Sequence, residues 1–111
     1  MKTYHGRNGH DVTIVQDGRV IGDLPLRLDL QNHSPDGFSW GYGGSGPAQL
    51  ALALLAEHFR ERPGGDARAL GLYQGFKWSV IAILLSEWVM SSDDIEAAIS
   101  AIKGVKLKAD G

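Results

Sequence analysis

Residues 40–62, WGYGGSGPAQLALALLAEHFRER, combine a glycine-rich loop with the clearest helical pattern in the chain. Four of the six residues from 41 to 46 are glycines, which lose much backbone entropy on folding. Ordering them normally requires positive φ angles or the close approach of other atoms. Pro47 stands where a first helical turn tolerates a missing N–H. We therefore predict an ordered loop that leads into a helix over residues 47–62.

The two sides of this helix differ in polarity. Its apolar side consists of Leu50, Leu54, Leu55, His58 and Phe59, and its polar side of Gln49, Glu57, Arg60 and Glu61. The sequence Pro63-Gly64-Gly65 that follows is typical of a helix end. The sequence thus predicts that one side packs on the core while the other faces water.

Upstream of the loop, the pattern favours strands. We expect short strands at residues 3–7, 11–16 and 19–21, with Asp17-Gly18 as the hairpin turn between the last two. Leucine occupies every second position of residues 24–30, which predicts a fourth strand.

Residues 31–37 form a polar loop in this interpretation, and residues 38–40 a further short strand. Downstream of the first helix, Asp66 is expected to cap a second helix over residues 67–74, which Gly75 would end. Residues 76–85 alternate apolar side chains onto one face and are apolar on both faces from Val80 on, which suits a central strand or a buried helix equally, and we favour the strand.

A third helix is expected to start at the capping pattern of residues 91–94 and to close at Lys103-Gly104. The fold class is therefore α+β: a small antiparallel sheet with two to three helices packed on one face. Residues 1–103 would form a single domain, and residues 104–111 a flexible tail.

The composition excludes several classes of protein. The 111 residues carry a formal net charge of −2 and no cysteine, so thiolate chemistry, disulfides and clustered basic residues for nucleic acid are not expected. The start lacks the apolar core of a signal peptide, and the longest apolar run is too short for a bilayer. We expect a cytoplasmic protein without a membrane partner, and the sequence leaves a homo-oligomer open.

The loop and the helix start form the candidate site, because main-chain N–H groups at a helix N-terminus suit an anion. The candidate ligand-binding residues are Trp40, Tyr42, Gly43, Gly44, Ser45, Gly46, Arg27 and His33. In the competing interpretation the loop is a tight structural turn that lets the rings of Trp40 and Tyr42 pack inward. Ser45 then caps the helix, and Arg27 and His33 are solvated side chains.

Other chemistry lacks support in the sequence. The spacing Gly41-x-Gly43-x-x-Gly46 matches a dinucleotide fingerprint, but the strand–loop–helix–strand context of that motif is missing. The histidines lack metal-ligand spacing, and no catalytic triad is arranged around Ser45. We therefore expect no catalytic residue, no metal and no cofactor.

The central motif, residues 32–53 (NHSPDGFSWGYGGSGPAQLALA), resembles a small uncharacterised family found in bacteria and their phages. Residues 4–7, 26–30 and 73–78 also fit this resemblance. The family has no assigned catalytic residues, so the resemblance transfers none. It implies a phage or mobile-element setting, where small proteins often counter host defences.

Three functions remain open at this point. The first is a binding module that sequesters a phosphate-bearing nucleotide signal, with the residue 43–46 amides on the phosphate and Tyr42 or Trp40 against the base. The second is an inhibitor that binds a host defence protein, of the anti-CRISPR or anti-restriction type. The third is a nucleotide-processing enzyme.

Overall fold

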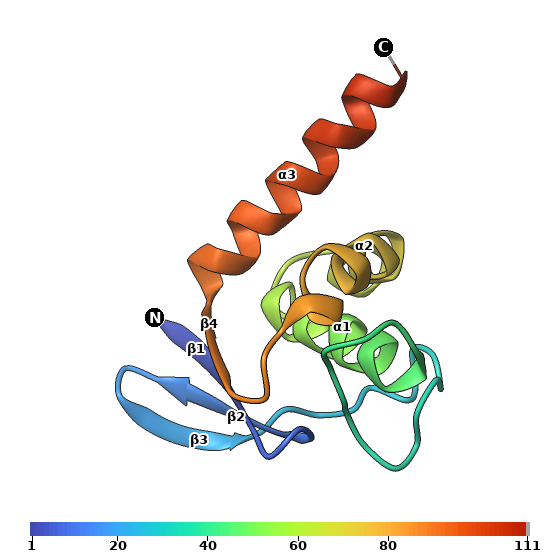
Figure 1. Ribbon diagram of the computed structural model, residues 1–111. Coiled ribbons are helices and arrows are strands. Elements are labelled where there is room, and N and C mark those ends of the chain that lie inside the picture. The colour runs from blue at the N-terminus through green and yellow to red at the C-terminus, as the bar shows by residue number, and fades with distance from the viewer. Residues whose placement is uncertain (111) are drawn as a thin grey trace.

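The computed structural model describes residues 1–110, with the side chains of residues 103–110 outside the description. A four-stranded antiparallel sheet and three helices form one α+β globule, as predicted (Figure 1). The strands are β1 (Lys2–Arg7), β2 (Asp11–Gln16), β3 (Arg19–Asp23) and β4 (Trp88–Ser91). The helices are α1 (Ser45–His58), α2 (Gly65–Ser79) and α3 (Ser92–Asp110), with a short 3-10 helix, η1 (Ile81–Ile83).

The sheet has the strand order β3-β2-β1-β4. The predicted hairpin is confirmed: Asp17 and Gly18 both have positive φ angles, as a two-residue type I′ turn requires. Tyr4 of β1 lies between Ile14 of β2 and Met90 of β4, and all three side chains are buried. One face of the sheet therefore packs on the core.

Residues 24–30 and 38–40 do not form the predicted strands. The first segment continues from β3, makes one backbone hydrogen bond from the Leu24 amide to the Val12 carbonyl oxygen at 3.0 Å, and turns at Arg27, whose φ is 56°. Its leucine alternation survives only in part, since Leu24 is buried while Leu26 and Leu30 are partly buried. The apolar positions of this segment anchor an irregular chain against the helices.

Helix α1 begins two residues earlier and ends four residues earlier than predicted, and it lies at the centre of the molecule. All twelve residues from 46 to 57 are buried, so the predicted polar side is wrong. Gln49 is fully buried and Glu57 is 8% exposed, because other elements cover this side as well. Glu57 is compensated by the ammonium of Lys2 at 2.7 Å.

Helix α2 is longer than predicted, and it corrects our interpretation of residues 76–85. Gly75 lies inside the helix, and the N-cap is Gly64 with no side-chain bond from Asp66. The helix continues to Ser79 and is followed by η1, so no strand forms here. Phe76 and Trp78, two residues apart, lie on opposite sides of α2: Phe76 is fully buried and Trp78 is 61% exposed.

The start of α3 confirms the predicted capping pattern. The amide of Asp94 donates to Ser91 Oγ at 3.1 Å, and the amide of Ser91 donates to Asp94 Oδ2 at 2.9 Å. The helix runs to Asp110, past the end predicted at Gly104. The predicted flexible tail, residues 104–111, falls on positions whose side chains lie outside the described part of the chain. Within the described residues, each helix is too short or too polar to cross a bilayer.

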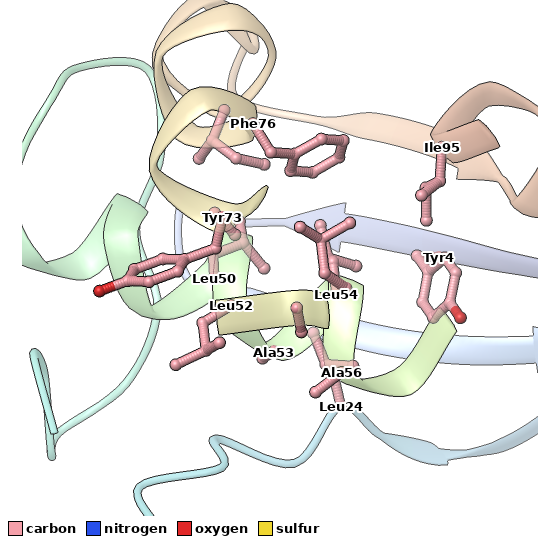
Figure 2. Packing of buried hydrophobic residues seen from close by; sticks show 14 of the residues in the cluster. Tyr4, Leu24, Leu50, Leu52, Ala53, Leu54, Ala56, Tyr73, Phe76 and Ile95 are labelled. Atoms are coloured by element: carbon pink, nitrogen blue, oxygen red, sulfur yellow. The ribbon is translucent and has the colours of Figure 1, made fainter. Parts of the chain in front are cut away.

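The hydrophobic core joins the sheet to the helices (Figure 2). Leucine and alanine side chains of α1 contribute more of it than any other element, and Figure 2 shows Tyr4, Phe76 and Ile95 around them. Burial raises the pKa of the Tyr4 phenol, with the nearby Glu57 carboxylate adding to the shift. The core thus fixes α1, and with it the glycine loop at its N-terminus.

Candidate functional site

The glycine loop is held against the chain that follows α2. Gly41 has a φ of 86°, and its amide donates to the carbonyl oxygen of Ile81 at 3.0 Å. The same glycine lies close to the carbonyl oxygen of Leu84. Glycine suits position 41 because the φ angle is positive and because an added Cβ atom would crowd the Leu84 carbonyl oxygen. The hydrogen bond to Ile81 anchors the loop on η1.

The later glycines are required by close approach of other residues. A Cβ atom on Gly43 would overlap the indole of Trp78, and one on Gly44 would lie 2.7 Å from the Tyr42 ring. A Cβ atom on Gly46 would overlap the hydroxyl of Ser39. Two aromatic rings thus pack directly on the main chain of the loop.

The N-terminus of α1 lacks a side-chain cap. Its N-cap is Gly44, so Ser45 is the first helical residue rather than the capping serine. Pro47 has no N–H, and the amide of Ala48 donates to the Gly44 carbonyl oxygen at 3.0 Å. Within the described residues, the amide of the exposed Ser45 has no acceptor. This end can therefore still donate hydrogen bonds to an anion.

The two aromatic residues that we predicted as ligand-binding differ in exposure: Trp40 is buried and Tyr42 is exposed. Trp40 is 7% exposed and packs edge-on against Trp88, with ring centroids 5.4 Å apart, so it belongs to the core. Tyr42 is 53% exposed, and its hydroxyl lies 2.8 Å from Ser39 Oγ. Of these two rings, only Tyr42 remains available to a ligand.

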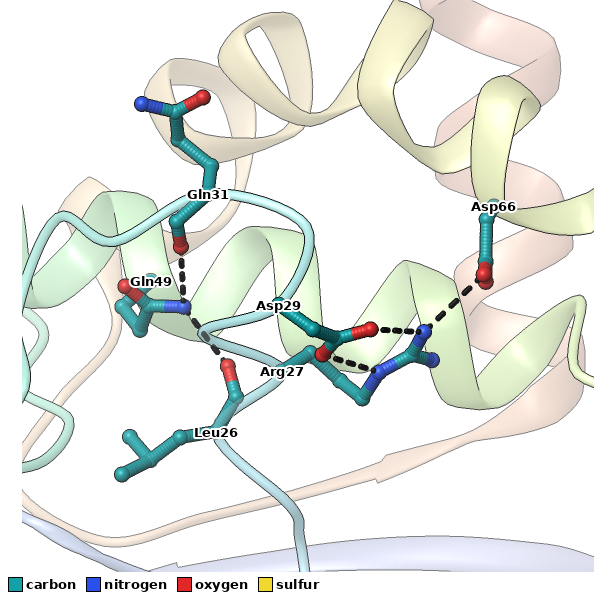
Figure 3. A network of polar contacts seen from close by, with 6 residues as sticks. All are labelled: Leu26, Arg27, Asp29, Gln31, Gln49 and Asp66. Carbon is teal, nitrogen blue, oxygen red and sulfur yellow. Dashed lines mark hydrogen bonds and ion pairs between the residues drawn. The ribbon is translucent and has the colours of Figure 1, made fainter.

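Arg27 is engaged in ion pairs with Asp29 and Asp66, away from the glycine loop, and Figure 3 shows these contacts. Its guanidinium binds both carboxylate oxygens of Asp29 at 3.0 Å and one oxygen of Asp66 at 3.0 Å. Asp66 stands at the start of α2, whereas Trp78, which packs on the loop, stands at its end. Twelve residues at about 1.5 Å each separate them by roughly 18 Å along the helix.

His33 supports the structure beside α2. Its Nε2 lies 2.8 Å from the Tyr73 hydroxyl, and its main-chain amide donates to Gln49 Oε1 at 2.8 Å. Both contacts are internal and neither involves the glycine loop. Gln49 was predicted to face water, and it instead connects this region to α1.

The buried side-chain amide of Gln49 makes four hydrogen bonds. Its oxygen accepts from the main-chain amides of His33 and Ser34. Its nitrogen donates to the carbonyl oxygens of Leu26 and Gln31, and Figure 3 shows these two bonds. We call this arrangement the Gln49 clamp. The clamp provides hydrogen-bond partners for main-chain groups of the irregular segment before the glycine loop, and it holds that segment over α1.

Sequence reasoning missed Trp78 as a neighbour of the loop. The expected strand placed Trp78 on a buried face, whereas α2 exposes it. The apolar residues Ala69, Tyr73 and Phe76 recur at helical spacing, and all three are buried on α2. This spacing was the sequence signal that could have extended the predicted helix to Trp78. Lys77 is 9% exposed, and its ammonium lies 4.3 Å from the centre of the Trp78 ring.

A second polar cluster lies at the other end of α1. The side chain of His58 is buried, and its Nε2 lies 2.7 Å from Glu96 Oε2 on α3. A cavity of about 580 Å³ next to it is lined by charged residues that include Lys2, Glu57 and Arg60. Among the described residues, no three side chains of His, Cys, Asp or Glu gather closely enough to hold a metal ion.

Replacing Glu96 by glutamine is expected to destabilise the protein at neutral pH by less than about 1 kcal/mol, because the carboxylate is half-exposed. The hydrogen bond with His58 holds the pKa of Glu96 below its ordinary value of 4.5. A lowered carboxyl pKa stabilises the fold above the unfolded-state pKa, and this contribution is lost as pH falls through the folded-state pKa. Urea unfolding of both proteins from pH 7 to pH 3 should show the difference shrinking below pH 4.5. A constant difference would contradict this.

The comparisons with known proteins bear on this geometry. Residues 4–101 match the family described as "Family of unknown function (DUF6166)". The chain belongs to the DUF6166 family. The match includes most of β1, the glycine loop, α1, α2 and the first half of α3. No curated protein and no solved structure matches the chain at a significant level. DUF6166 membership thus assigns no residue a role, and the argument for function depends on the site itself.

Proposed function

We propose that this protein is a non-catalytic binding module for a phosphate-bearing small molecule, with the glycine loop and the start of α1 as its site. The observation that carries the proposal is the uncapped N-terminus of α1 beside two exposed residues, Ser45 and Tyr42. Free amides and the positive end of the helix dipole favour a phosphate there.

The roles within the site follow from exposure. The amide and hydroxyl of Ser45, with the main chain of Gly43 and Gly44, would hold the phosphate. Tyr42 would stack on a base, because its ring is half-exposed at the edge of the loop. Trp40 is buried and plays no direct part.

We further propose a phage or mobile-element setting for the protein. In that setting, sequestration of a nucleotide signal in the cytoplasm would counter a host defence. This step rests on the resemblance of the central motif and on analogy with other small phage proteins. The site chemistry supports only the coarser statement, that an anion suits the loop.

Titration calorimetry against cyclic nucleotides and ADP-ribose-type nucleotides tests the proposal. We expect at least one member to bind with a dissociation constant below about 1 mM, which corresponds to a binding free energy of about −4 kcal/mol. Tyr42→Ala should weaken that binding roughly fivefold or more, by the loss of one stacked ring. Arg19→Gln, at the exposed hairpin end, is the control and should leave affinity unchanged.

Two results would count against this function. Absence of binding across the panel would remove the small-molecule role, and chemical conversion of a bound nucleotide would replace storage by turnover. Mass spectrometry of the nucleotide after incubation distinguishes storage from turnover.

A second candidate function is inhibition of a host defence protein by surface contact. It is favoured by four exposed apolar side chains near the site, Tyr42, Trp78, Ile83 and Leu85. Large exposed apolar groups often mark protein interfaces. Capture of a single defence protein from host lysate, lost in Ile83→Asp, would support this function over the first.

A further inference from the structure

The cavity of about 580 Å³ lies at the C-terminal end of α1, at the opposite end of this helix from the glycine loop. Its first wall is the end of the sheet, where Lys2, Gln16 and Ile21 come from β1, β2 and β3. Its second wall consists of residues 57, 58 and 60–62, at the end of α1 and in the turn that follows. Small-molecule sites occupy roughly 300–1,000 Å³, so the cavity has room for a small ligand.

Buried ion pairs hold the inner part of this cavity in place. The side chains of Glu57 and His58 are 7% and 4% exposed, although both residues line the cavity. The Glu57 carboxylate accepts a hydrogen bond from the Lys2 ammonium at 2.7 Å. His58 Nε2 lies 2.7 Å from Glu96 Oε2. Since buried charges are stable only when paired, these contacts fix the side chains of the inner wall before a ligand binds.

Two arginines line the same cavity with much more exposed side chains. Arg60 and Arg62 are 62% and 48% exposed, and both also line an adjoining cavity of about 340 Å³. Arg60 lies 3.5 Å from Glu57, and Arg62 lies 3.8 Å from Glu96. Both distances are longer than the roughly 2.7–2.9 Å of a charge-assisted hydrogen bond, and each carboxylate already has a closer partner. The planar guanidinium forks can therefore turn toward a carboxylate or a phosphate.

The balance of charge in the cavity favours an anion. Its lining includes three permanent cations, Lys2, Arg60 and Arg62, against the carboxylates of Glu57 and Glu61. Glu57 is buried and compensated by Lys2, whereas Glu61 is exposed to water. The two arginines thus carry most of the uncompensated charge, and Glu61 is the group that opposes an anion.

We propose that this cavity is a second binding site, which holds a small oxyanion compound, a phosphate or a carboxylate, between Arg60 and Arg62. The buried pair of Lys2 and Glu57 forms its inner wall. The site goes beyond the proposed function, because it uses no residue of the glycine loop. The 14 residues of α1 separate the two places by roughly 21 Å, so one phosphate group cannot occupy both.

Titration calorimetry of the full chain with inorganic pyrophosphate and with citrate tests this site. We expect at least one of them to bind with a dissociation constant below about 1 mM, and the tighter one identifies a phosphate or a carboxylate compound. Arg60→Gln and Arg62→Gln should each weaken this binding roughly fivefold or more, because charge-assisted hydrogen bonds are lost. Glu61→Gln should tighten it roughly two- to fivefold, since an opposing charge is removed.

Arg7→Gln is the matched control for the loss of one positive charge. Arg7 is exposed at the other end of β1 from Lys2, so its substitution should leave the affinity unchanged. Equal binding by wild type, Arg60→Gln and Arg62→Gln would overturn the proposal. So would the absence of binding of both probes to the wild-type protein.

Amide and guanidinium NMR signals of the wild-type protein locate the bound probe without any substitution. We expect the probe to shift the signals of residues 57–62 and of the Arg60 and Arg62 side chains. Shifts confined to residues 43–46 would contradict this site and support the proposed function. Shifts at residues 57–62, with no nucleotide of the panel shifting residues 43–46, would support this site and contradict the proposed function.

Discussion

Replacing Gln49 by leucine is expected to lower the free energy of unfolding by about 4 kcal/mol. The substitution keeps an apolar side chain of similar size on the central helix but removes all four hydrogen bonds of the Gln49 clamp. The amides of His33 and Ser34 and two carbonyl oxygens then lose their partner. Each unsatisfied buried polar group costs about 1–3 kcal/mol, and partial hydration of the segment recovers some of this.

Urea unfolding followed by far-UV circular dichroism measures the effect, with Gln31→Leu as the matched control. Gln31 is exposed and contributes only its main-chain carbonyl to the clamp, so the same substitution there should change stability by less than about 0.5 kcal/mol. Equal effects at the two positions would show that Gln49 does not hold the segment. Gln49→Glu should also lower stability, because an acceptor for the amides of His33 and Ser34 is kept while the donor to the Leu26 and Gln31 carbonyl oxygens is lost.

The parts of the fold that could be predicted from the sequence are those fixed by local chemistry. Asp17-Gly18 meets the φ requirement of a tight hairpin turn, so β2 and β3 follow from residues that adjoin them. The reciprocal bonds of Ser91 and Asp94 likewise depend on four consecutive residues. The start of α1 was placed to within two residues because the loop glycines and Pro47 limit where a helix can begin.

The parts that could not be predicted depend on partners distant in sequence. The polar side chain of Gln49 is typical of a surface residue. It is buried because the segment around Leu26 folds over it. Residues 24–30 alternate like a strand, but an extended chain without a neighbouring strand leaves its main chain unpaired, and the Gln49 clamp satisfies this segment instead.

The sequence predicted a candidate site at the glycine loop but only part of the surroundings of that loop. The glycines indicated close approach, and the approaching groups proved to be Ser39, Tyr42 and Trp78. Trp78 was misplaced because it lies in a segment whose apolar pattern fits two kinds of structure, and we favoured the strand over the helix that forms. Arg27 could not be excluded as a ligand, because its partner Asp66 is 39 residues away.

The pair Phe76→Ala and Trp78→Ala is expected to give very different losses of stability. In a strand, residues 76 and 78 would face the same side, and both truncations would be similarly costly. In α2, Phe76 is fully buried and Trp78 is 61% exposed. Phe76→Ala should therefore cost about 3–5 kcal/mol through lost burial and a cavity, the larger part of the stability of a small domain.

Trp78→Ala serves as the matched control, and we expect it to cost less than about 1 kcal/mol, because most of its ring is already in water. Equilibrium unfolding in urea, with circular dichroism as the probe, compares the two variants with the wild-type protein. Similar losses at both positions would support a strand at residues 76–85 and would remove Trp78 from the surface. A large loss confined to Phe76 instead fixes the helical phase of α2, on which the position of Trp78 beside the glycine loop depends.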